Sequence, residues 1–166
     1  MWFELRKETL AFIERAPVVH TVDAIVAAPR AAVFTMVVEP QTWSTWFPGV
    51  RAASYPSGLP YGVGTIRQAH VGRTHWVEEI IAWDAETRWA YTVLRSSVPM
   101  ARAQVESFAF DDAAGGTRVA WTLALEPRLL ARLGAPLTAR VVERLFHRAM
   151  RNLEALLRPS PSADSP

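Results

Sequence analysis

Cysteine is absent from the 166-residue chain. The chain therefore has no disulfide bonds and no thiolate metal sites, and it is long enough to bury one core without such links. No apolar run reaches the roughly 18 residues of a membrane-spanning helix. No basic start followed by an apolar run marks a secretory leader. From these absences we expect a cytoplasmic protein without a membrane span.

Lysine is almost absent as well. Of the 18 basic residues only Lys7 is a lysine, so a lysine base or Schiff base in a pocket is not expected. The net charge is +2, and the isoelectric point of about 9.5 reflects arginine rather than a strong positive field. Segment 128–158 is rich in arginine but has Phe146 as its sole aromatic residue, whereas nucleic-acid grooves interleave aromatics. We interpret it as a solvated helix face without a nucleic-acid partner, the alternative being an anionic partner.

The C-terminal run 135–158 predicts one long amphipathic helix. Pro136 suits a first helical turn and Pro159 ends the helix. Apolar residues recur at helical spacing on one face, namely Leu137, Val141, Leu145, Ala149, Leu153 and Leu156. Such a helix needs a large apolar surface to lie on, and the strands upstream can supply it.

The remaining pattern predicts an α+β domain over 18–158. Two short helices, Arg30–Val38 and Gln41–Trp46, are expected after a first strand. The expected strands are Val18–Ala28, Val50–Tyr55, Val63–Val71, Thr74–Trp83, Trp89–Arg95, Arg102–Phe110 and Thr117–Glu126. The last six are joined by short turns, which implies an antiparallel meander. Residues 1–17 are expected to form an N-terminal extension, either a short helix or an extended arm, and 159–166 a disordered tail.

The segment 28–50, APRAAVFTMVVEPQTWSTWFPGV, resembles the START-like (SRPBCC) superfamily of polyketide cyclase/dehydrase and lipid-transport proteins. The resemblance is carried by Pro29, Val33, Phe34, Pro40, Trp43, Trp46, Pro48, Gly49 and Val50. Segments 78–84 and 116–122 also look like family stretches. The resemblance implies a helix-grip fold, in which a seven-stranded antiparallel sheet wraps the C-terminal helix. It further implies binding of a small hydrophobic molecule between sheet and helix.

The best candidate for polar chemistry lies on the hairpin of the third and fourth strands. A two-residue Gly72-Arg73 turn would oppose Arg67 to Glu78 on one face. In plant hormone receptors of the superfamily, a glutamate at the position resembling Glu78 points into the ligand cavity, which favours this face as the inner one. The alternative is an ion pair that only braces the sheet. The expected pocket is lined by Arg67, Trp76, Glu78, Trp121, Leu145 and Ala149.

The sequence gives little support for a metal site, for nucleophilic catalysis or for dinucleotide binding. His70 and His75 oppose each other in the same register, but on the outer face and without the third or fourth ligand that zinc requires. There is no Gly-x-Ser-x-Gly elbow and no glycine-rich dinucleotide loop. We therefore expect no metal and no cofactor, and no catalytic residue can be assigned from the sequence. The inward or outward direction of Tyr91 stays open.

Three functions fit these observations. The first is binding or transport of a small hydrophobic, lipid-like or polyketide-like molecule. The second is a cofactor-free enzyme of the cyclase, aromatase or dehydratase type, which would use Arg67 and Glu78. The third is an interaction module that uses the basic helix face. A negligible pocket between the sheet and the C-terminal helix would favour this third function. The sequence leaves the ligand and the choice between monomer and homodimer open.

Overall fold

The computed structural model describes residues 1–128 and 135–158, with only the backbone given for 135–138. The strands are β1 (Phe3–Glu4), β2 (Val18–Val26), β3 (Val50–Ser54), β4 (Ile66–Val71), β5 (Thr74–Asp84), β6 (Arg88–Ser96), β7 (Ala101–Ala113) and β8 (Gly116–Pro127). The α-helices are α1 (Arg30–Val38), α2 (Trp43–Trp46) and α3 (Ala135–Leu157). The expected tail lies outside the described residues.

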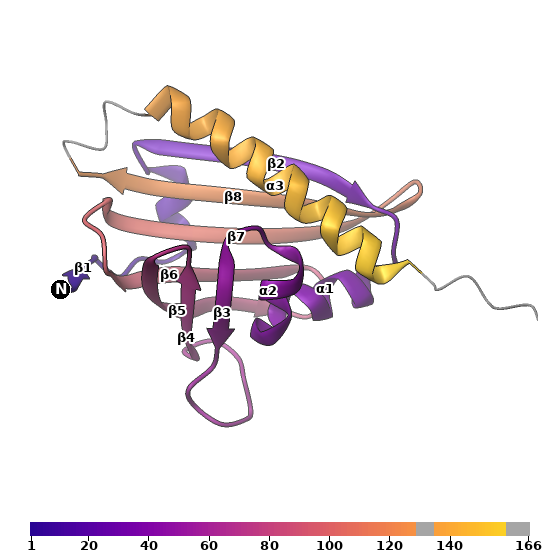
Figure 1. The fold of residues 1–166 in the computed structure, drawn as a ribbon, viewed down its shortest axis with the longest axis horizontal. Helices are drawn as coiled ribbons and strands as arrows, with labels where there is room; N and C mark the ends of the chain where they lie inside the picture. The colour runs from indigo at the N-terminus through magenta and orange to yellow at the C-terminus, as the bar shows by residue number, and fades with distance from the viewer. Residues whose placement is uncertain (129–134, 159–166) are drawn as a thin grey trace, which may run out of the picture.

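The strands form one antiparallel sheet in the order β2-β8-β7-β6-β5-β4-β3. The sheet curls, and α3 lies diagonally across its concave face over β2 and β8 (Figure 1). Register shifts within the β5–β6 pairing, between Val77 and Glu78 and between Ile80 and Ala82, bend the sheet as β-bulges do. The predicted helix-grip fold is confirmed, with seven main strands, a long C-terminal helix and short helices between β2 and β3.

The buried face of α3 follows the predicted apolar stripe only in part, because Val141 and Leu156 of that stripe are 55% and 52% exposed. Phe146, Met150 and Leu153 are buried in the core between helix and sheet. The C-terminal half of α3 also packs on the short helices, where the Asn152 side-chain amide donates to the carbonyl of Trp46 over 3.0 Å. The concave face is therefore closed by α1 and α2 at this end of the helix (Figure 1).

Several element boundaries in the structure differ from the expected ones. The strand expected from Val63 begins only at Ile66, because Gly62–Thr65 forms a turn in which the N–H of Thr65 donates to the carbonyl of Gly62 over 3.1 Å. Gly64 adopts a φ of +89°, which ordinary strand residues avoid. The second expected short helix is divided into a 3₁₀ turn (Pro40–Thr42) and α2.

The N-terminal segment closes a gap in the sheet. β6 and β7 pair only up to Thr92 and Val105, and beyond that point β1 pairs with β6. The N–H of Leu5 donates to Leu94 and that of Arg6 to Arg102, each over 2.8 Å, so the segment bridges both strands. The arm is thus extended at its start rather than helical.

A 3₁₀ helix, Leu10–Glu14, follows this arm. Phe12 is buried there, on the outer face of the sheet, against Ala103, Val105 and Ala124. Because this cluster is separated from the main core by the sheet itself, residues 1–17 add a small second core to the domain.

Candidate functional site

The β4–β5 hairpin has the predicted register. Gly72 adopts a φ of +60° in the turn, and Arg67 opposes Glu78 while Ala69 opposes Trp76. Side chains alternate between the faces of a strand, so these four residues share the concave face. His70 and His75 lie exposed on the opposite face, with ring centroids 3.9 Å apart. No group of three or more metal-ligating side chains gathers among residues 1–128 and 135–158.

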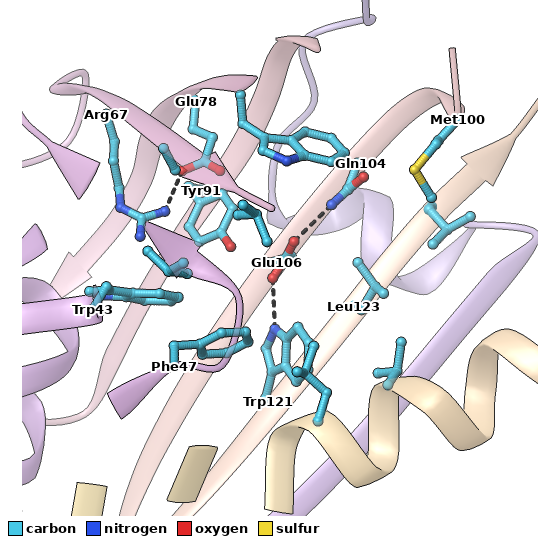
Figure 2. A pocket seen from close by; sticks show the side chains of 17 residues that line it. Trp43, Phe47, Arg67, Glu78, Tyr91, Met100, Gln104, Glu106, Trp121 and Leu123 are labelled. Carbon is cyan, nitrogen blue, oxygen red and sulfur yellow. Dashed lines mark hydrogen bonds and ion pairs between the residues drawn. The ribbon is translucent and has the colours of Figure 1, made fainter. Parts of the chain in front are cut away.

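A cavity of about 260 Å³ lies between the concave face, α2 and α3. Five of the six predicted pocket residues line it, namely Arg67, Trp76, Glu78, Trp121 and Leu145. Figure 2 shows Arg67 and Glu78 at one end of the cavity, Glu106 in its middle and Met100 at the other end. The hairpin, β6, β7, β8 and α3 thus bring together residues that are far apart in sequence.

Ala149 does not line this cavity. Its side chain is completely buried in the apolar core, one helical turn beyond Leu145. At this level α3 already packs on the short helices, as the bond from Asn152 to Trp46 shows. The small side chain therefore lies in solid packing rather than leaving space for a ligand.

Arg67 and Glu78 form a buried ion pair. Nη1 of Arg67 donates to Oε2 of Glu78 over 2.5 Å, and the residues are 1% and 4% exposed. Burial raises the pKa of the Glu78 carboxyl, although the Arg67 charge acts against this shift. Burial is the largest single influence on the pKa of Arg67 and would lower it, but the charge and hydrogen bond of Glu78, together with Tyr91 and Tyr55, outweigh burial and the pKa is raised. The pair is thus held inside the cavity wall rather than at a solvated sheet surface.

The guanidinium of Arg67 also lies among aromatic rings. Its Cζ is 4.1 Å from the centroid of the Trp43 ring, 5.6 Å from Trp89 and 5.5 Å from Tyr91. Such cation–π contacts stabilise a guanidinium away from water. Among the residues that the structure describes, Nε and Nη2 have no hydrogen-bond partner, so two donors of the guanidinium are buried without an acceptor.

Glu106 is a second buried carboxyl group that the sequence analysis missed. Its Oε2 accepts from Nε1 of Trp121 over 2.8 Å, and its Oε1 accepts from the Gln104 amide over 2.7 Å. Burial raises the pKa of Glu106, and the three hydrogen-bond partners Tyr91, Gln104 and Trp121 act in the opposite direction. A signal for it exists in the sequence, because alternation along β7 places Gln104 and Glu106 on the same face as Phe108.

Aromatic side chains form most of the remaining wall. Trp121, which is 5% exposed, stacks on Phe108 and Phe146 at centroid distances of 5.9 and 5.5 Å. Trp121 thus lies beneath α3, as predicted. Tyr91 faces the cavity, and burial raises its pKa well above the ordinary value. Trp43 and Trp46 are buried core residues, and Trp43 also borders the cavity.

The whole arrangement is an apolar, aromatic cavity with convergent polar groups. Such a site can hold a compact ring system and hydrogen-bond its oxygen atoms. The family model for polyketide cyclase/dehydrase and lipid transport matches residues 17–158. The chain belongs to this family. Membership in the family supports a hydrophobic ligand-binding or cyclase role without deciding between the two.

Two mycobacterial proteins are similar to this chain in sequence. An uncharacterised protein of Mycobacterium tuberculosis is 30% identical over 118 residues, which cover 69% of this chain and 70% of that protein. A protein of Mycobacterium bovis matches with the same identity and coverage.

Solved structures of other proteins share the fold of this chain. A START superfamily protein from Mycobacterium smegmatis superposes with a TM-score of 0.66 at 14% identity, covering 84% of this chain and 95% of that chain. The Zhui aromatase/cyclase from Streptomyces sp. R1128 gives a TM-score of 0.63 at 20% identity, covering 84% of this chain and 92% of that chain. None of the helices in the described residues is long and apolar enough to span a membrane.

Proposed function

We propose that this protein binds a small, largely apolar molecule in the cavity between sheet and α3, with Arg67 and Glu106 hydrogen-bonding its oxygen atoms. The observation that carries the proposal is the pair of donors on the buried Arg67 guanidinium that find no partner within residues 1–128 and 139–158. A buried donor without an acceptor is costly, and an acceptor supplied by a ligand would remove that cost. The basic face of α3, in contrast, carries a more open hollow that is lined mostly by charged side chains, among them Arg140, Arg144 and Arg151.

The size of the cavity narrows the ligand class. A volume of about 260 Å³ corresponds to the space of about nine water molecules in the liquid. This is slightly below the range of about 300–1,000 Å³ that is typical of ligand pockets. A compact molecule of one or two rings fits this space better than a long-chain lipid.

Isothermal titration calorimetry with the aromatic ketone 2-acetonaphthone tests the proposal. We expect saturable binding to the wild type and none to Leu145→Trp, because Leu145 lines the cavity and a larger side chain would fill it. Val141→Trp is the matched control, since Val141 is 55% exposed on the same helix. Equal binding by the wild type and Leu145→Trp would place the ligand outside the cavity and contradict the proposal.

A cofactor-free enzyme is the second candidate, and Glu106 is the observation that favours it. A carboxyl group whose pKa is raised by burial is a stronger base, and it can take a proton from the carbon next to a ketone while a nearby donor holds the ketone oxygen. The proton passes from carbon to the Glu106 carboxylate, and the C–H electron pair moves into an enolate held by Arg67.

Deuterium exchange separates this enzyme from a carrier. In D₂O a catalyst of this kind would exchange the methyl protons of 2-acetonaphthone, as followed by NMR. Exchange that is fast with the wild type and lost in Glu106→Gln would favour the enzyme. Binding without accelerated exchange would favour the carrier.

A further inference from the structure

The cavity contains an unequal number of acidic and basic groups. Of the side chains that the structure describes, three charged ones line it, namely Arg67, Glu78 and Glu106. Arg67 is bonded to Glu78 over 2.5 Å, so the single guanidinium already has its carboxylate. Glu106 is 8% exposed and forms no ion pair among the described residues. Its hydrogen-bond partners, the Trp121 indole, the Gln104 amide and the Tyr91 hydroxyl, carry no charge.

Because these groups are buried, the excess of acidic over basic groups is energetically costly. An unpaired ionised carboxylate is poorly stabilised in a low-dielectric site, and a nearby anion raises the cost further. The charge of Glu106 itself raises the pKa of Glu78. A ligand that brought another negative charge would therefore meet both carboxyl groups at once, although the free donors of Arg67 would attract it.

We propose that Glu106 makes the cavity selective for neutral molecules bearing a ketone, phenol or similar oxygen, and that it excludes carboxylates of the same size and shape. The inference rests on the proposed function, since it concerns the ligand of the same cavity. A neutral oxygen can accept from Nε or Nη2 of Arg67 without adding charge, and it can accept from Glu106 when that group is protonated. Selectivity thus comes from an uncompensated acidic group rather than from shape.

Two nearly isosteric probes test the charge selectivity. 2-Acetonaphthone is neutral, and 2-naphthoate replaces its methyl group by a negatively charged oxygen. In calorimetric titrations at about pH 7.5 we expect the wild type to bind the ketone about tenfold or more tightly than the carboxylate. In Glu106→Gln the carboxylate should gain at least about tenfold, because Arg67 then offers its donors without an opposing second acid.

Glu79→Gln is the matched control, because it removes the same charge from the outer face of β5, where Glu79 pairs with Lys7. It should preserve the selectivity of the wild type. Equal affinities of the wild type for the two probes would overturn the inference while leaving the proposed function intact, and this comparison needs no variant. A wild type that binds neither probe would instead contradict the proposed function, and the inference with it.

Discussion

Replacing Glu106 by glutamine should stabilise the folded protein at neutral pH. The substitution keeps the size of the side chain. Its amide oxygen can still accept from the Trp121 indole, and its amide nitrogen can donate to Gln104 once that amide turns over, because Gln104 now bonds the other carboxyl oxygen. The change therefore removes a buried acid without leaving its partners unbonded.

The sign of the effect follows from the direction of the pKa change. Burial raises the pKa of Glu106 in the folded chain above its value in the unfolded chain, which is about 4.3. Between these two pKa values the folded state binds more protons than the unfolded state, so the free energy of unfolding falls as the pH rises through this window and then levels off. Glutamine does not titrate and avoids that loss.

The size of the stability gain depends on how much the acid dissociation constant of Glu106 differs between the folded and the unfolded chain. Each tenfold difference in that constant corresponds to about 1.4 kcal/mol in the free energy of unfolding. Removing the Glu106 charge also relieves its effect on the pKa of Glu78. We expect Glu106→Gln to gain about 1 kcal/mol or more at about pH 7.5 and the gain to vanish near pH 4.

Urea unfolding across this pH range measures the difference. The control is Glu79→Gln, which loses an ion pair on the outer face and should gain nothing at neutral pH. A Glu106→Gln protein that is less stable than the wild type at every pH would refute the reasoning. It would show that the carboxylate is ionised and well stabilised by its hydrogen-bond donors.

Three further substitutions test the packing and one tests the ion pair. Trp121→Ala should lower the free energy of unfolding by about 3–5 kcal/mol, and an unchanged urea midpoint would mean that the indole is not beneath α3. Ala149→Phe should destabilise by about 1–3 kcal/mol or more because no cavity receives the ring, and a wild-type melting temperature would contradict this. Phe12→Ala should cost about 3–5 kcal/mol in urea yet leave calorimetric affinity for 2-acetonaphthone unchanged, since Phe12 lies on the outer face; weakened binding in the folded variant would contradict that separation. Glu78→Gln should cost about 3–5 kcal/mol because Arg67 is left without its partner, and a loss below about 1 kcal/mol would argue against a buried pair.

Short-range patterns account for what the sequence could predict. The register of β4 and β5 depends on one two-residue turn at Gly72-Arg73 and on the alternation of strand residues, so the amino-acid sequence alone is enough to place Arg67 opposite Glu78. Helical spacing likewise places Ala149 and Leu153 on the buried face of α3, although the same spacing includes Val141 and Leu156, which are exposed. Neither of these two predictions requires the positions of segments that are distant in the sequence.

The missed features depend on long-range geometry. Glu106 lies on β7, which is joined to the hairpin through β6 and the connections Asp84–Thr87 and Ser96–Met100. The sequences of these connections do not fix the register, so they do not show which face of β7 lies on the same side as Arg67 and Glu78. Helical spacing shows that Ala149 faces the core, but not that α3 meets the short helices at that level. The extended arm at the N-terminus exists because β6 and β7 separate beyond Thr92, which no local pattern reveals.

A crystal structure of the protein with 2-acetonaphthone tests the central claim most directly. The account predicts electron density for the naphthalene ring among Trp43, Trp76 and Trp121, with the ketone oxygen within hydrogen-bond distance of Arg67 or Glu106. Density for the ketone only on the surface, with side chains of the cavity wall closed over its space, would contradict the claim that this cavity is the binding site.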